Sequence, residues 1–244
     1  MNKSATERTI AAVELNRSRE KGLAMSIEKN VQEVEQRIAR ACERAGRSPD
    51  EVKLVAVTKT TGVPSILAAF DAGIRHFGEN RVQEAKPKIA ELESLKPDAT
   101  WHMIGHLQSN KAKTACDIFD IIHSVDSLKL AQTLGGGCRK QLPVLIEVNI
   151  ASEETKSGFA LAEVEQAVQQ IKGLPNLRVD GLMTIAPWVA DAEQVRPVFR
   201  RLRELGDQLG LSQLSMGMTD DFEVAIEEGA TMVRIGRAIF GERA

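Results

Sequence analysis

One lysine stands at the end of an apolar run, where its amine could do chemistry. The stretch LVAVTKT covers residues 54–60, and its first four residues have the apolar character of a buried strand. Thr58 and Lys59 end that run, and Gly62 and Pro64 indicate a turn beyond it. Apolar surroundings lower the pKa of an ammonium group, and an uncharged amine attacks carbonyl carbon atoms. Lys59 is therefore either an ordinary solvated lysine or a nucleophile that forms a Schiff base.

A second group of residues, close to the C-terminus, has the composition of a phosphate site. The stretch SMGMTDD places Thr219 after a strand end that contains glycine, and VRIGRAIFG places Gly236 and Arg237 where a strand meets a helix. Backbone N–H groups at such junctions bind phosphate, and a hydroxyl group and the positive charges of Arg234 and Arg237 would add to the site. An ordinary strand-to-helix turn, capped by threonine and aspartate, explains the same residues equally well.

The elements that must position these residues alternate regularly along the chain. Eight apolar segments are expected to be strands, and a helical pattern follows each of them. Several segments are apolar almost throughout, as expected when both faces of a strand are covered. The expected fold is a single (β/α)8 barrel of the α/β class, and a doubly wound sheet is disfavoured because no GxGxxG follows the first strand. The strands are expected at 52–58, 74–79, 101–105, 120–125, 143–150, 177–185, 213–218 and 232–236.

A closed barrel would bring the lysine and the phosphate site together. Functional residues of such barrels lie at the C-terminal ends of the strands, and the first and last strands are neighbours. Lys59 would then face the loops after the last two strands. A single molecule that carries both an aldehyde and a phosphate would contact both sites. Pyridoxal phosphate (PLP) is one such molecule, and a sugar-phosphate substrate of an aldolase is the alternative.

The composition excludes several other classes of protein. The chain has 244 residues, 43% of them hydrophobic, and a net charge of -2, so no basic surface for nucleic acid is expected. Its apolar runs are far shorter than the roughly 20 residues that span a bilayer. The three cysteines, Cys42, Cys116 and Cys138, form no CxxC pair, which predicts neither a disulfide nor a zinc site and favours the cytoplasm. His102 and His106 lack a third ligand, so no metal is expected.

The N-terminal segment differs from the rest of the chain. Residues 1–25 are polar and are expected to form a flexible or helical extension, followed by one barrel domain over 26–244. A helix is predicted to begin with Ser26 as its N-cap and to end at Gly46. The three consecutive glycines at 135–137 are expected to form a loop.

The order and spacing of several motifs resemble those of one family. These stretches are LVAVTKT, HFGENRVQEAKPK, WHMIGHLQSNK, IHSVDS, VNIASEETKSGF, GLMTIAP and LSMGMTDDFEVAIEEGATMVRIGRAIFG. Through them the chain resembles, from about residue 26 to 242, the PLP homeostasis proteins, also called the YggS or proline-synthase co-transcribed family. That family is similar to the N-terminal barrel of alanine racemase.

The resemblance implies a set of cofactor contacts. It implies a barrel that holds PLP as an internal aldimine, with an asparagine and an arginine beside the pyridine ring and a phosphate cup at the last two strands. Two positions depart from the family pattern, because Thr219 and Arg237 stand where relatives commonly have serine and a small hydroxyl residue. The matching residues are Lys59 for the aldimine, Asn80 and Arg234 for the ring, and Met218, Thr219, Gly236 and Arg237 for the phosphate.

The resemblance also implies what the protein does with PLP. Alanine racemase needs a tyrosine as one of its two bases, and this sequence contains no tyrosine. The leading expectation is a non-catalytic, cytoplasmic and monomeric carrier or regulator that buffers or delivers PLP, with apo forms of PLP enzymes as partners. A racemase-like PLP enzyme is the alternative, in which His102, His106, Cys116 or an acid at the rim would be the second proton carrier. An aldolase without a cofactor is the third.

Overall fold

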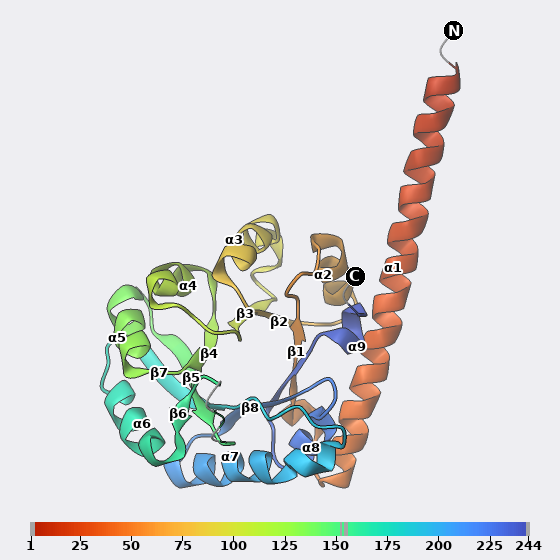
Figure 1. Cartoon of the computed structure of the whole chain (residues 1–244). Helices are drawn as coiled ribbons and strands as arrows, with labels where there is room; N and C mark the ends of the chain where they lie inside the picture. The colour runs from red at the N-terminus through yellow and green to blue at the C-terminus, as the bar shows by residue number, and fades with distance from the viewer. Residues whose placement is uncertain (1–2, 152, 154–155, 243–244) are drawn as a thin grey trace.

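Eight parallel strands close into a barrel in the computed structural model, which describes residues 3–151, 153 and 156–242. β1 pairs with β2 on one side and with β9 on the other, and β4 pairs with β5 to complete the ring. The expected (β/α)8 barrel is therefore confirmed (Figure 1). Its strands are β1 (Lys53–Val57), β2 (His76–Glu79), β3 (Thr100–Met103), β4 (Ile121–Val125), β5 (Leu142–Asn149), β7 (Leu177–Met183), β8 (Gln213–Met218) and β9 (Met232–Ile235). A two-residue strand, β6 (Phe159–Ala160), extends the sheet beside β5.

One helix follows each strand of the ring and covers its outer face (Figure 1). Short 3-10 turns at Ser109–Lys111, Leu161–Glu163 and Ala192–Val195 precede α4, α6 and α7, and two others, at Pro49–Glu51 and Glu93–Leu95, precede β1 and β3. The helices are α2 (Val63–Asp71), α3 (Val82–Glu91), α4 (Ala112–Ile118), α5 (Leu128–Gly137), α6 (Val164–Lys172), α7 (Arg196–Leu209), α8 (Phe222–Glu227) and α9 (Arg237–Phe240).

The first helix, α1 (Lys3–Arg44), is longer than the sequence pattern predicts. The predicted N-cap at Ser26 is wrong, because good helix formers stand on both sides of it and no proline interrupts them. The predicted end is confirmed, since Gly46 has a positive φ of 65°. From residue 21 onward, where the burial of side chains is described, the first buried one is Ile27, and the N-terminal part of α1 projects beyond the barrel (Figure 1). The division into an extension over 1–25 and a domain over 26–244 stays a prediction.

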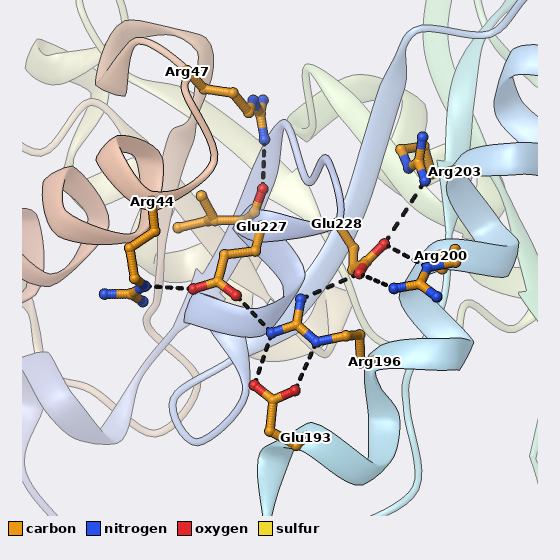
Figure 2. Close-up of polar contacts among 9 residues, drawn as sticks. Arg44, Arg47, Glu193, Arg196, Arg200, Arg203, Glu227 and Glu228 are labelled. Carbon is orange, nitrogen blue, oxygen red and sulfur yellow. Dashed lines mark hydrogen bonds and ion pairs between the residues drawn. The ribbon is translucent and has the colours of Figure 1, made fainter.

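No helix within the described ranges, α1 included, combines the length and the apolar character needed to cross a membrane. The C-terminal half of α1 packs against α2, α8 and α9 on the outside of the barrel. An outer ion-pair network fastens α1 to α8 and α8 to α7 (Figure 2). Its members are Arg44, Glu193, Arg196, Arg200, Arg203, Glu227 and Glu228.

The apolar core consists of two layers separated by the barrel wall. A large outer cluster lies between strands and helices, and a small inner one contains Val55, Ile121, Leu145, Met183 and Met232. Successive side chains of a strand point to opposite faces, so the residues two and four positions beyond the inner cluster also point inward. This alternation directs Lys59 and Arg234 toward the C-terminal mouth of the barrel.

Two expectations about the outer shell are wrong. Gly135, Gly136 and Gly137 form the last turn of α5 instead of a loop. A side chain at Gly135 would come within 2.9 Å of the Pro175 carbonyl oxygen, so glycine permits the close approach of the chain that leads into β7.

The second correction concerns the cysteines. Cys116 on α4 and Cys138 at the end of α5 form a disulfide, with a distance of 5.1 Å between their Cα atoms. Their separation of 22 residues gave no signal in the sequence, because only the packing of α4 against α5 brings them together. Cys42 is a buried free thiol on α1.

Candidate functional site

A cavity of about 840 Å³ opens at the C-terminal end of the barrel, where β1, β2, β8 and β9 meet. Its volume lies in the range of sites that bind small organic ligands. We call it the mouth cavity. The structure brings all seven predicted site residues together around it, whereas their binding of a cofactor stays a prediction. They are Lys59, Asn80, Met218, Thr219, Arg234, Gly236 and Arg237.

Lys59 is held on a tight turn that follows β1. The Thr61 N–H donates to the Thr58 carbonyl oxygen at 3.0 Å, and Thr60 adopts a left-handed conformation with φ of 62°. Because a threonine rarely adopts that conformation, the surrounding contacts must maintain it. Lys59 itself is half-buried and lines the mouth cavity.

Three residues that the sequence analysis missed hold this turn from below. The Lys88 ammonium group donates to the Thr58 carbonyl oxygen at 2.7 Å, to Glu79 Oε1 at 2.9 Å and to Glu84 Oε1 at 2.8 Å. Glu84 also accepts a hydrogen bond from the Thr60 N–H. The i,i+4 spacing of Glu84 and Lys88 on α3 was the available signal.

Glu79 is the most deeply buried member of that support. It is fully buried at the end of β2 and accepts a hydrogen bond of 2.7 Å from the Thr58 hydroxyl group. Burial raises the pKa of Glu79, and the hydrogen bonds from Thr58 and Lys88 oppose that rise. The group therefore fixes the backbone beside Lys59 and is itself closed off from solvent.

Asn80 provides a test of whether a ligand fits the mouth cavity. Its Oδ1 atom is buried and has no hydrogen-bond partner in the described structure, although buried polar atoms are nearly always paired. A side chain at Gly105 would come within 2.5 Å of the Asn80 carbonyl oxygen, so glycine is required beside it. An amide that faces a cavity without a partner is suited to a polar ligand, as the cofactor assignment requires.

Arg234 supplies a fixed positive charge at the floor of the mouth cavity. It is 4% exposed, and its guanidinium group donates to Ser215 Oγ at 2.6 Å and to the Thr184 carbonyl oxygen at 2.9 Å. Burial lowers the pKa of Arg234 to about 10, while the charges of Asp221 and Glu147 oppose the decrease. The group remains a cation at neutral pH and cannot accept a proton from a ligand.

The predicted phosphate cup is partly engaged by acids of the chain itself. The Met218 N–H donates to Asp221 Oδ1 at 2.6 Å, so this amide is already satisfied. The Arg237 guanidinium group contacts both carboxylate oxygens of Asp220, at 2.5 and 2.7 Å. The remaining donors of the cup are the Thr219 hydroxyl group and the first N–H groups of α9, which have no intrahelical acceptor.

Two glycines shape the cup. Gly217 has φ of 88°, and a side chain there would come within 2.6 Å of Ala225 Cβ, so α8 packs directly on the end of β8. A side chain at Gly236 would lie 3.3 Å from Val57, because the ends of β9 and β1 approach each other closely here. Both positions keep the backbone close to the space that a phosphate would occupy.

Glu147 is a further inward residue that the sequence analysis missed. It is 6% exposed on β5, and burial, followed by the charge of Asp126, raises its pKa to about 7. Arg234 and His106 oppose the rise. An acid inside the apolar run VLIEVN was the available signal, because an acid in a strand with both faces covered must point into the barrel or pair with a partner.

Three of the predicted second proton carriers of a racemase-like enzyme lie elsewhere, whereas two acids at the rim, Asp220 and Glu242, line the mouth cavity. His102 lines a different cavity, at the N-terminal end of the barrel, and Cys116 is in the disulfide on the outer shell. His106 Nδ1 lies 2.9 Å from Asp126 Oδ2, outside the residues that line the mouth cavity. The described residues contain no group of three or more histidines, cysteines or acids that could hold a metal ion.

Comparisons with known proteins agree with this geometry. Residues 29–244 match the family model of the alanine racemase N-terminal domain. A pyridoxal phosphate homeostasis protein of Aquifex aeolicus is 46% identical over 217 residues, which cover 85% of this chain and 94% of that protein. The structure of PipY from Synechococcus elongatus with PLP bound is 40% identical, with a TM-score of 0.72 over 84% of this chain and all of PipY (100%).

A more distant structure supports the fold alone. Alanine racemase from Corynebacterium glutamicum is 20% identical, with a TM-score of 0.69 over 90% of this chain and 61% of the racemase chain. At that identity the likeness shows a shared barrel and carries no information about activity.

Proposed function

We propose that this protein binds PLP and takes part in PLP homeostasis. The chain belongs to the family of pyridoxal phosphate homeostasis proteins, whose barrel is of the alanine racemase N-terminal domain type. The observation that carries this proposal is the convergence of a lysine amine, an unpaired buried amide oxygen and a buried arginine on one cavity. These are the groups that an aldehyde, a pyridine ring and their substituents require.

The residues of the mouth cavity divide the binding of PLP among them. Lys59 would provide the amine for the aldehyde, on a turn fixed by Lys88 and its two acids. Arg234, held by two acceptors, would place a permanent cation beside the ring nitrogen and so favour its unprotonated form. The Thr219 hydroxyl group and the N–H groups at Gly236 and Arg237 would bind the phosphate.

We propose that the cofactor is held for buffering or delivery and is not used for turnover of an amino acid. PLP, when bound, supplies an electron sink for carbanion chemistry. His102, His106 and Cys116 do not line the mouth cavity, and the rim acid Asp220, which does, is paired with Arg237. A positive charge fixed at the ring nitrogen would also weaken the sink. Both features support storage over catalysis.

The first experiment tests attachment through Lys59. Purified protein incubated with PLP is expected to show a visible absorption band that borohydride removes, and Lys59→Ala is expected to lose it entirely while its unfolding temperature changes little. Lys53→Ala is the matched control, because Lys53 begins β1, at the end opposite to the turn that carries Lys59. Retention of the band in Lys59→Ala would contradict the assignment of the amine.

The second experiment separates a carrier from an enzyme. Exchange of the α-protons of a panel of amino acids in D2O, followed by NMR, is expected to be no faster with PLP-loaded protein than with free PLP. Exchange well above free PLP and above Lys59→Ala would establish an enzyme, and the carrier proposal would be abandoned.

We also propose a cytoplasmic monomer that passes PLP to apo forms of PLP enzymes. Transfer is measured as recovery of activity of an apo-enzyme that receives PLP-loaded protein, compared with an equal amount of free PLP. Sedimentation at several concentrations tests the monomer. Recovery no faster than the spontaneous release of PLP from the protein would exclude direct transfer.

A further inference from the structure

Three of the four histidines form a continuous hydrogen-bonded file through the middle of the barrel. His76 Nδ1 lies 3.0 Å from His102 Nε2, and His102 Nδ1 lies 2.8 Å from His123 Nε2. The file continues through Ser215 Oγ, which lies 2.8 Å from His123 Nδ1 and 2.6 Å from Arg234 Nη1. Branched apolar side chains usually fill a barrel interior, so this polar file requires a separate explanation. We call His76, His102, His123 and Ser215 the histidine chain.

The histidine chain connects two cavities at opposite ends of the barrel. Its last contact, Arg234, lines the mouth cavity. Its first two members, His76 and His102, line a second cavity of about 550 Å³ at the N-terminal ends of the strands. The charged side chains that line this N-terminal cavity are Lys53, Asp120, Arg178 and Asp180.

Only one direction of the hydrogen bonds gives the buried Ser215 hydroxyl proton an acceptor among the described contacts. Arginine has donors and no acceptor, so Arg234 must donate to Ser215 Oγ. The other described partner of Ser215 Oγ is His123 Nδ1, and we assign it as the acceptor of the hydroxyl proton because a buried donor is nearly always paired. His123 then donates from Nε2 to His102 Nδ1, and His102 donates from Nε2 to His76 Nδ1. All three rings are thus assigned as the Nε2–H tautomer.

Burial keeps this arrangement uncharged. His102 and His123 are 2% and 0% exposed, and burial holds the pKa of each well below the ordinary histidine value. The charges of neighbouring groups act in the same direction, chiefly His123 on His102 and Arg234 on His123. Burial, followed by the charge of Lys53, also lowers the pKa of His76. The only cation of the file is Arg234 at its upper end.

We propose that the histidine chain is a set of positioning residues that hold Arg234 from below and couple it to the N-terminal cavity. Each ring accepts a hydrogen bond at one nitrogen and donates at the other. A change of partner at His76 therefore changes which nitrogen of His102 carries the proton. If His76 became a donor at Nδ1, the reversal would run to Ser215, whose oxygen would then accept hydrogen bonds from both His123 and Arg234. The buried Ser215 hydroxyl proton would lose its acceptor, and this cost would disturb the contact that holds Arg234. The coupling to PLP rests on the proposed function, whereas the direction of the hydrogen bonds in the histidine chain does not.

The first test uses the full chain without cofactor. Long-range proton–nitrogen NMR of ¹⁵N-histidine-labelled protein is expected to show three neutral Nε2–H rings. Ser215→Ala removes the donor to His123 and is expected to produce mixed tautomers at His123, His102 and His76, while His106→Gln, outside the chain, leaves those three rings unchanged. An Nδ1–H or protonated ring among the three in the unsubstituted protein, or unchanged His102 and His76 signals in folded Ser215→Ala, would overturn the proposal.

The second test asks whether the N-terminal end affects the mouth cavity. His76→Leu removes the acceptor for His102, whereas the amide oxygen of His76→Gln can replace it, so the two variants form a matched pair. His76→Leu is expected to shift the absorption maximum of bound PLP and to weaken PLP binding by about fivefold, with His76→Gln close to the unsubstituted protein. Equal spectra and affinities in the pair would remove the coupling.

The two tests keep two failures apart. Absence of a PLP absorption band in the unsubstituted protein would contradict the proposed function. The order of the histidine chain would still be tested by the histidine tautomers of the cofactor-free protein. Ordered tautomers together with a band that no member of the matched pair alters would contradict the coupling alone. Circular dichroism of His76→Leu and Ser215→Ala establishes that each variant is folded.

Discussion

The barrel interior and the outer seam between α1, α7 and α8 are both rich in polar side chains, but they carry charge very differently. In the outer ion-pair network every member is charged, and Arg196 alone contacts Glu193, Glu227 and Glu228 (Figure 2). In the interior, His102 and His123 are neutral. Arg234, the cation that donates to the last member of the histidine chain, lies beside the mouth cavity.

The difference teaches that access to water decides the charge state of a polar cluster. The side chains of Arg196 and Arg200 are 24% and 51% exposed, so each charge keeps part of its hydration and loses little when it pairs. The rings of the interior have no such hydration, and the cost of burying a charge there exceeds what one hydrogen bond returns. Polar residues inside the barrel therefore serve the site, and those outside serve stability.

The largest expected effect is on the outer shell, at the disulfide. Reduction of Cys116–Cys138, or the double substitution Cys116→Ala and Cys138→Ala, frees a loop whose ends are 22 residues apart and is expected to lower the free energy of unfolding by about 3 to 4 kcal/mol. Denaturant unfolding with and without reductant measures this. PLP affinity is expected to be unaffected, and a large loss of affinity would contradict the division between shell and interior.

The next effect sharpens the rule for the interior. The pKa of Glu147 is about 7 in the folded protein and 4.5 ordinarily, so the folded state binds its proton more tightly. Stability is therefore lost as pH rises from 4.5 to 7, and the full cost, about 3 kcal/mol, is present above pH 7. Glu147→Gln is expected to be more stable than the unsubstituted protein above pH 7 and equal to it at pH 4.5 and below. Equal stability at every pH would show that the carboxyl group is not desolvated.

The outer ion-pair network predicts the opposite pH dependence. Hydrogen bonds from Arg200, and after them those from Arg196, lower the pKa of Glu228 below 4.5, while burial opposes the decrease. A lowered folded pKa stabilises the protein above pH 4.5, and this contribution is lost as pH falls further. Glu228→Gln is expected to cost about 2 kcal/mol near neutral pH, because its arginine partners are only partly buried, and much less in acid.

The smallest expected effect serves as the control for that result. Arg44→Ala removes a pair whose arginine is 51% exposed and is expected to cost about 0.5 kcal/mol. Thermal and denaturant unfolding of both variants measure the comparison. If Arg44→Ala lowered the free energy of unfolding as much as Glu228→Gln, burial would not determine how much each residue of this network contributes to stability.

Much of the fold was predictable because its signals are local. The apolar runs and helical periods located all eight strands of the barrel, and the seven residues predicted at the strand ends all line the mouth cavity. Local rules were wrong for two different reasons. Ser26 is a good N-cap, yet α1 continues through it because helix formers stand on both sides. Gly135 lies in the last turn of α5, where its lack of a side chain permits close packing with Pro175.

The sequence predicted residues that line the mouth cavity, but it did not predict the residues that hold the Lys59 turn in place. Lys59 stands out because an amine follows an apolar run, whereas Glu79 and Lys88 look like ordinary surface charges until β1, β2 and α3 are packed together. Cys116 and Cys138 are similar, because nothing in their spacing indicates that α4 and α5 are neighbours.

The sequence by itself determined the number and order of the strands, the parallel barrel and the residues at its mouth, because those features follow from periodicity and from the alternation of side chains along a strand. Only the tertiary structure decided which polar groups meet across the barrel. His76, His102, His123, Ser215 and Arg234 come from five different strands. The closure of the sheet places them within hydrogen-bond distance, and burial then determines which of them carries a charge.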